Sequence, residues 1–154
     1  MFAHAPREVI NILSNENVTV NAHQFCIDDD NLRAYNLTAD WRVMSHNHDE
    51  YGVKFISTVE HRRYPFYGVQ FHPEKNAYEW KASKAHAHSM NAVRSNRYFM
   101  DFFVSECRKS EHSFASASEE NQYVIYNYEA KFTGVLGSAY QQCYMFEPRG
   151  TVGE

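Results

Sequence analysis

The stretch YPFYGVQFHPEKNAYEW, residues 64–80, decides the fold because it joins a short apolar run to an abrupt polar break. Residues 66–71 are rich in aromatic and β-branched side chains, a composition typical of a buried strand. Pro73 lacks an N–H and cannot extend a central strand, so we expect the strand to end at His72. An ionisable pair, His72 and Glu74, would then lie at the carboxyl end of a strand, the edge where open α/β sheets bind ligands.

The spacing of His72 and Glu74 suits general-base chemistry. A carboxylate two residues after a histidine can turn back and accept a hydrogen bond from the imidazole Nδ1–H. That bond fixes the tautomer and leaves Nε2 as a base towards a thiol or hydroxyl elsewhere in the fold. A bare H-x-E pattern is also compatible with a turn of two solvated polar residues, because so short a match is only a hypothesis.

The longer phrase GVQFHPE, residues 68–74, resembles the His–Glu segment of class I glutamine amidotransferase-like proteins. Four further segments are similar, in the same order, to the gamma-glutamyl hydrolase family: FISTVE at 55–60, KNAYEW at 75–80, SMNAVRSNRYFMDFFVSECRK at 89–109 and QQCYMFE at 141–147. The resemblance covers nearly the whole chain and is loosest before Val18. It implies an α/β fold, the C-terminal part of a flavodoxin-like amidotransferase domain whose sheet is flanked by helices.

This resemblance implies a cysteine peptidase, without a cofactor, that hydrolyses γ-glutamyl bonds in folyl- and antifolyl-poly-γ-glutamates. His72 and Glu74 match two members of the family's Cys-His-Glu triad. His23 matches a histidine near the family's pocket, so it is a candidate for substrate contact, with a packed core histidine as the alternative. The family's nucleophile lies on a glycine-flanked elbow upstream of the histidine. The chain has three cysteines, none flanked by glycine: Cys26, Cys107 and Cys143. We therefore expect a C-terminal half that lacks the nucleophile and is inactive alone.

Three alternatives stay open at this point. The chain could belong to a glutamine amidotransferase that passes ammonia to a synthase, although no synthase-like segment is present. It could also be a truncated, non-catalytic homologue. Finally, Cys26 could be the nucleophile, but a cysteine within a strand pattern is usually a small buried apolar group.

Composition and short motifs bear on location and partners. Two glycosylation sequons begin at Asn17 and Asn36, and the resemblance implies a lysosomal and extracellular glycoprotein that is a homodimer when complete. Residues 1–8 are too polar for the core of a signal peptide, so none is expected. A net charge of −4 gives no reason to expect nucleic acid or an anionic membrane. No long apolar run predicts a membrane span.

Histidines and aspartates raise the question of a metal. His86 and His88 could join the His72–Glu74 pair around zinc, but without a helical H-E-x-x-H or a cysteine pair we expect surface histidines and no metal. The acidic run at residues 28–30 is interpreted as a turn or a helix start rather than a metal loop.

Periodicity predicts the remaining elements. Strands are expected at residues 18–27, 41–45, 53–59, 122–128 and 140–147, with a hairpin between the second and third. Helices are expected at residues 6–13 and 90–109. Ser89 would cap the longer helix, whose sheet-facing stripe would be Val93, Met100, Phe103, Val104 and Cys107. Gly68 would let another backbone approach. Residues 75–88 are expected to be a loop and residues 111–121 a linker. Residues 1–110 would form the hydrolase domain, and residues 111–154 a linker and extension packed on it.

Overall fold

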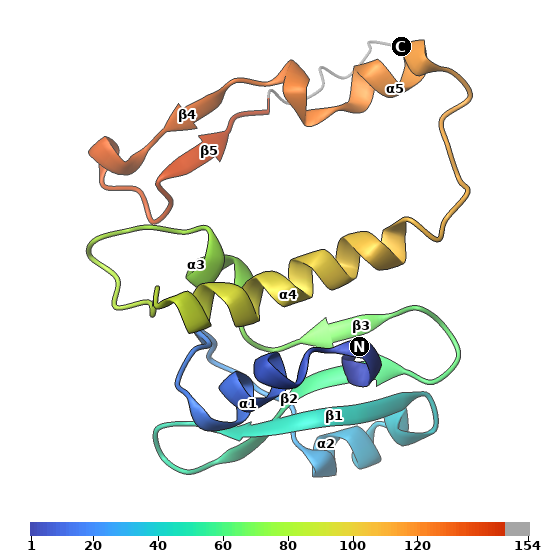
Figure 1. Cartoon of the computed structure of the whole chain (residues 1–154), viewed down its shortest axis with the longest axis vertical. Coiled ribbons are helices and arrows are strands. Elements are labelled where there is room, and N and C mark those ends of the chain that lie inside the picture. Colours follow the sequence, from blue (N-terminus) through green and yellow to red (C-terminus); the bar gives the residue numbers. More distant parts are fainter. Residues whose placement is uncertain (147–154) are drawn as a thin grey trace. The chain divides into compact units, whose positions relative to one another are not determined.

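The computed structural model of the chain describes residues 1–146 (Figure 1). Two compact units are present, one of Met1–Glu79 with Ala85–Lys109 and one of Trp80–Lys84 with Ser110–Glu154. The end of the last predicted strand, Glu147, lies outside the described residues. That residues 111–154 pack on the domain formed by residues 1–110 stays a prediction.

The first unit is built on a three-stranded antiparallel sheet in the order β1-β2-β3. Its strands are β1 (Trp41–His48), β2 (Lys54–His61) and β3 (Tyr67–Val69). The first two form the predicted hairpin, paired from Trp41↔His61 to His48↔Lys54 with an irregularity between Val43 and Ser45. Asp49 closes the turn by accepting backbone N–H bonds from Tyr51 and Val53.

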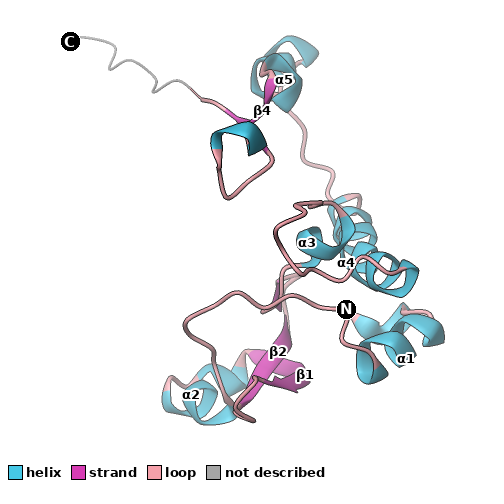
Figure 2. Cartoon of the chain, turned by 90° about the vertical axis from the view of Figure 1, so that its left-hand side faces the viewer, coloured by secondary structure: helices cyan, strands magenta, loops and turns pink. Residues whose placement is uncertain are grey.

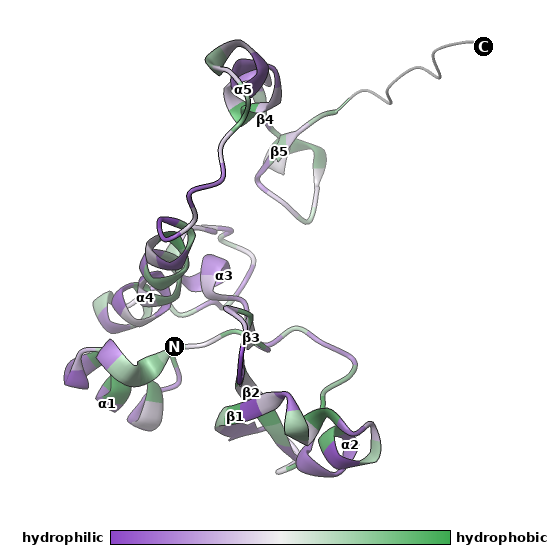
Figure 3. Cartoon of the chain, turned by 90° about the vertical axis from the view of Figure 1, so that its right-hand side faces the viewer, coloured by the Kyte–Doolittle hydropathy of each residue, from purple (hydrophilic) through white to green (hydrophobic). Residues whose placement is uncertain are grey.

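Helices flank this sheet on both faces. They are α1 (Arg7–Asn15), α2 (Asp29–Ala34), α3 (Pro73–Ala77) and α4 (Met90–Cys107). The helices α1 and α4 lie on one face and α2 lies on the other (Figure 2). Both α1 and α4 carry hydrophilic and hydrophobic residues along their length (Figure 3), and Ile12 of α1 forms a buried cluster with Val18 and Ala92. The predicted α/β fold, a sheet flanked by helices, is confirmed.

The strand predicted at residues 18–27 is wrong. This segment is irregular, although Val20 O accepts the His72 N–H at 2.8 Å and Ile27 O accepts the Ile56 N–H at 2.8 Å. Because these bonds are isolated and do not form a ladder, the segment is not a strand. Its apolar alternation does not track burial either, since Val18 is buried but Phe25 is 86% exposed.

The sheet-facing stripe predicted for α4 is also wrong. Ser89 caps the helix as predicted, accepting the Ala92 N–H at 3.1 Å. Phe103, however, is 62% exposed. The buried residues are mostly small or polar: Ala92, Ser95, Asn96 and Phe99. Small side chains let the helix approach closely and the polar ones find hydrogen bonds, so hydrophobicity alone selected the wrong face.

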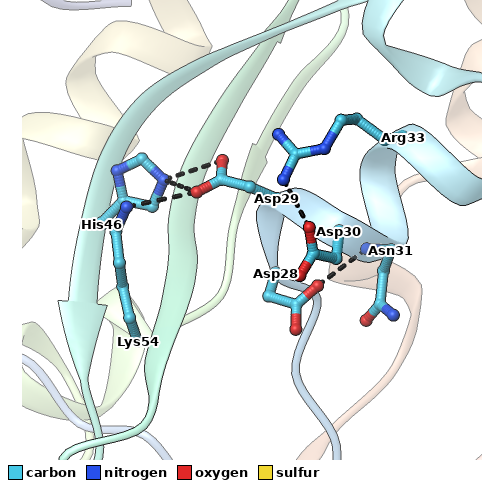
Figure 4. A network of polar contacts seen from close by, with 7 residues as sticks. All are labelled: Asp28, Asp29, Asp30, Asn31, Arg33, His46 and Lys54. Carbon is cyan, nitrogen blue, oxygen red and sulfur yellow. Dashed lines mark hydrogen bonds and ion pairs between the residues drawn. The ribbon is translucent and has the colours of Figure 1, made fainter.

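The acidic run starts α2, as predicted (Figure 4). Asp28 Oδ1 accepts the Asn31 N–H at 2.7 Å and caps the helix. Asp29 reaches across to the sheet, where His46 Nε2 lies 3.0 Å from its carboxylate and Lys54 Nζ 3.2 Å from it. The bond with His46, followed by that with Lys54, lowers the pKa of Asp29.

The second unit combines short helices and a two-stranded sheet. Its elements are α5 (Ala117–Tyr123), β4 (Ala130–Phe132) and β5 (Gln142–Tyr144), and the two strands pair antiparallel. The strand predicted at residues 122–128 is wrong, because α5 and a 3-10 turn occupy this region. Ser116 accepts the Glu119 N–H at 3.1 Å, a capping-box spacing that reveals a helix start within the predicted linker.

Single 3-10 turns occur at Phe2–His4, Leu37–Ala39, Ile125–Asn127 and Gly134–Leu136.

Two kinds of feature are absent from residues 1–146. No group of three or more His, Cys, Asp or Glu side chains in this range is arranged to hold a metal ion. Within the same range, no helix combines the length and the apolarity needed to cross a membrane.

Candidate functional site

The candidate site begins where β3 gives way to α3. The strand ends at Val69, three residues earlier than predicted. Phe71 is buried and meets Phe99 of α4 with ring centroids 5.0 Å apart, which fixes the chain just before His72. Pro73 is the first residue of α3, a position where a missing N–H leaves no bond unmade. The predicted loop at residues 75–88 is therefore helical in its first turn.

His72 and Glu74 meet at this helix start. His72 Nδ1 lies 3.0 Å from Glu74 Oε1, the contact that their spacing predicted. With the proton on Nδ1, the carboxylate accepts this bond and Nε2 keeps its lone pair. The imidazole is 31% exposed, so solvent and small molecules can reach it. This arrangement is that of a general base held by a carboxylate.

His23 lies directly against His72. The two imidazoles are stacked, with ring centroids 4.6 Å apart and planes inclined by 15°. His23 is exposed, which excludes the packed core histidine considered from the sequence. The stack brings together two residues that are 49 positions apart in the chain. No local pattern in the sequence indicates this contact.

A hollow of about 570 Å³ adjoins His23. It is lined by residues of the irregular segment, by Asp49 and Glu50 of the β1–β2 turn, and by Gln70. Cys26 also lines it and is exposed, so the expectation that Cys26 is a small buried group is wrong. Among the contacts of the described residues, the side chain of His72 meets Glu74 and His23, and neither supplies a thiol or a hydroxyl.

The remaining candidates are the sequon asparagines, His88 and two cysteines. Both sequon asparagines, Asn17 and Asn36, are exposed. His88 Nδ1 bonds the backbone oxygen of Asn76 at 2.9 Å. Cys107 ends α4 and is exposed, and Cys143 lies in β5 of the second unit.

The chain is similar to a known protein family. Residues 2–92 match the family described as "Glutamine amidotransferase class-I", a range that contains His23, His72 and Glu74. The family match also fits the predicted flavodoxin-like amidotransferase fold.

Three curated relatives illustrate the similarity. The chain is 40% identical over 148 residues to "Gamma-glutamyl hydrolase" of Homo sapiens, covering 96% of this chain and 46% of the relative. It is 37% identical over 131 residues to "Gamma-glutamyl hydrolase B" of Dictyostelium discoideum, covering 84% and 38%. It is 34% identical over 151 residues to "Gamma-glutamyl hydrolase 1" of Arabidopsis thaliana, covering 97% and 43%. The chain thus spans less than half the length of these relatives.

Proposed function

Because the chain belongs to the class I glutamine amidotransferase family, we propose that it carries the acid–base half of a gamma-glutamyl hydrolase site. The reaction is hydrolysis of γ-glutamyl bonds in folyl- and antifolyl-poly-γ-glutamates. The names of the similar proteins support this activity. The observation that carries the proposal is the 3.0 Å contact between His72 Nδ1 and Glu74 Oε1.

In this proposal the residues have separate roles. His72 Nε2 takes the proton of a cysteine thiol, whose sulfur then attacks the γ-amide carbonyl and forms a thioester. The imidazolium next protonates the leaving amine, and in the second half-reaction Nε2 activates the water that hydrolyses the thioester. Glu74 holds the ring in the correct tautomer and stabilises the imidazolium. His23 contacts the substrate beside the ring of His72.

We propose that the nucleophilic thiol lies on a glycine-flanked elbow outside these 154 residues. None of the three cysteines has such flanking glycines. Cys26 lies on the irregular segment and Cys107 at the end of a helix. Neither place offers the sharp strand-to-helix turn that exposes a nucleophile beside oxyanion-hole N–H groups.

We propose glycosylation at Asn17 and Asn36, which their exposure permits, in a lysosomal and secreted protein. The complete enzyme would be a homodimer.

The test compares glutamate release from a folyl-γ-polyglutamate by this chain and by a chimera. The chimera joins the chain to the part of the Homo sapiens relative that precedes the shared region. We expect no release by the chain alone and release by the chimera. His72→Ala should lower kcat/KM of the chimera by about 10²-fold or more, because general base catalysis contributes this much.

Two results would contradict the proposal. A His72→Ala chimera as active as its parent would remove His72 from the mechanism. Release by the unmodified chain, abolished in Cys26→Ser, would place the nucleophile at Cys26 and contradict its proposed location.

A further inference from the structure

The segment that carries His23, residues 18–27, is fixed in place without belonging to a helix or strand. Four of its carbonyl oxygens accept hydrogen bonds, those of Val18, Val20, Phe25 and Ile27. Two of the donors are backbone N–H groups. The other two are side-chain amides, which belong to Gln70 and Asn96. The position of His23 therefore depends on single bonds that a point substitution can remove.

Asn96 makes the shorter of the two side-chain bonds. Its Nδ2 donates to Val18 O at 2.7 Å and to Ala92 O of its own helix at 2.8 Å, whereas Gln70 reaches Phe25 O only at 3.3 Å. Asn96 is 0% exposed, and Val18 is 3% exposed. Within the described residues, Asn96 Oδ1 is buried without a hydrogen-bond partner. A buried amide oxygen of this kind is costly, so packing alone does not favour an asparagine here.

Val18, which accepts the bond from Asn96, is only a few residues before the part of the chain that contacts His72. Val20, two residues after Val18, accepts the backbone N–H of His72 at 2.8 Å. Three residues after Val20, the ring of His23 stacks on the ring of His72. Asn96 and the backbone of His72 thus hold the two ends of the short piece 18–20 that leads to the stack.

We infer that Asn96 is a positioning residue for the His23–His72 pair, acting through the carbonyl oxygen of Val18. Its functional meaning rests on the proposed function, since the stack matters for hydrolysis only if His72 is the base. Asn96 lies outside the range that matches the family, residues 2–92, and touches neither ring in the contacts described. Asn96 therefore acts by holding the segment of residues 18–27 in position.

Ser95 provides a matched control. It is also 0% exposed and lies next to Asn96 on α4. Its hydroxyl lies 2.8 Å from Asn91 O and 3.3 Å from Ala92 O, and both acceptors belong to the same helix. Ser95→Ala therefore removes a buried polar group from the same helix without loosening the segment.

The experiment uses nuclear magnetic resonance on the 154-residue chain with Asn96→Leu and Ser95→Ala. Leucine has the same number of side-chain heavy atoms and the same branching at Cγ as asparagine, but it has no donor. In Asn96→Leu we expect loss of the nuclear Overhauser contact between the rings of His23 and His72. The His72 amide should exchange with solvent about tenfold faster, the equivalent of losing one typical hydrogen bond from its anchor. Ser95→Ala should keep both signals. An Asn96→Leu chain that folds and keeps the ring contact and the slow His72 amide would overturn the inference.

A second measurement covers the case in which Asn96→Leu does not fold. In the unmodified chain, a scalar coupling across the hydrogen bond should connect Asn96 Nδ2 to the carbonyl carbon of Val18. Presence of the coupling supports the link, and its absence overturns it. None of these measurements requires turnover. A chimera that is inactive, together with loss of the stack in Asn96→Leu, would contradict the proposed function and retain the positioning role.

Discussion

The imidazole of His23 is stacked on that of His72, with centroids 4.6 Å apart and planes inclined by 15°. One residue comes from an irregular segment and the other from the start of α3. Glu74 holds the edge of the His72 ring by accepting a bond from Nδ1 at 3.0 Å. His72 is thus constrained in its plane by a carboxylate and across its face by a ring.

The face-to-face contact predicts distinct roles for the ring and the nitrogens of His23. In the chimera, His23→Phe should keep kcat within a few-fold of the parent and raise KM, because phenylalanine preserves the stacking face but cannot donate or accept a hydrogen bond to substrate. His23→Ala should lower kcat as well, since the face is lost. Steady-state kinetics of glutamate release measures both constants. Equal kcat values for His23→Ala and the parent would contradict the role of the ring.

The contact with Glu74 predicts a loss of activity when its charge is removed. Glu74→Gln keeps the size of the side chain but replaces the anionic acceptor. A hydrogen bond to a charged group contributes about 1.5–3 kcal/mol, so kcat/KM of the chimera should fall by about 10- to 100-fold.

Glu79→Gln serves as the control for this change. Glu79 is a second carboxylate close by in the sequence, and its Oε2 accepts from Lys75 Nζ at 2.8 Å. We expect its kinetics to stay near those of the parent. Equal losses in the two variants would mean that Glu74 has no special role.

The sequence predicted the local features of the site and missed those that depend on distant residues. The contact between His72 and Glu74 followed from spacing, because the two residues are two positions apart and Pro73 between them fixes the turn. The hairpin and the Ser89 cap were also predicted correctly, because each depends on residues that are close together in the sequence. The strand predicted at residues 18–27 failed because apolar alternation does not supply the partner edge that strand formation requires.

The buried face of α4 shows a second limit. Apolar periodicity selected Phe103 and Val104, both exposed, while the packed face contains Ser95 and Asn96. Polar residues are buried when a particular partner satisfies them, and for Asn96 that partner is Val18, 78 residues away. Nothing near Asn96 in the sequence carries this information.

The lowered pKa of Asp29 predicts an acid-dependent stability. The cause is first the hydrogen bond with His46 and then that with Lys54 (Figure 4). A carboxyl group whose pKa is lower in the folded chain stabilises the fold above its unfolded pKa, and this contribution is lost as the pH falls through the folded pKa. For an aspartate this stabilising contribution begins to be lost at about pH 4. The free energy of unfolding should therefore be lower in Asp29→Asn at pH 5, and the difference should shrink towards pH 2.

Urea unfolding at several pH values measures this difference. Asp30→Asn is the matched control, because Asp30 also lies in the first turn of α2 and faces the same helix dipole. Its carboxylate pairs with Arg33 of its own helix, so it does not link α2 to the sheet. We expect a smaller effect at pH 5. A pH-independent difference for Asp29→Asn would show that its charge is not what stabilises the fold.

Gly68 supports the strand that leads to His72, for a reason other than the predicted one. A Cβ at this position would lie 2.9 Å from Val59 Cγ2 on the paired strand β2, so the constraint comes from a side chain and not from a backbone. Gly68→Ala should destabilise the fold by about 1–3 kcal/mol, as overpacking typically does. In a Val59→Ala background the clashing methyl is absent, and Gly68→Ala should cost much less.

A double-mutant cycle by chemical denaturation measures this coupling between Gly68 and Val59. The two residues are direct partners in the β2–β3 register, so relief by Val59→Ala is expected to be local. If Gly68→Ala cost the same in both backgrounds, the clash would not be the cause, and the loss would have to come from the backbone itself. With the clash as the cause, the glycine is needed because β2 places a branched side chain opposite it, close to where the chain turns into the His72–Glu74 pair.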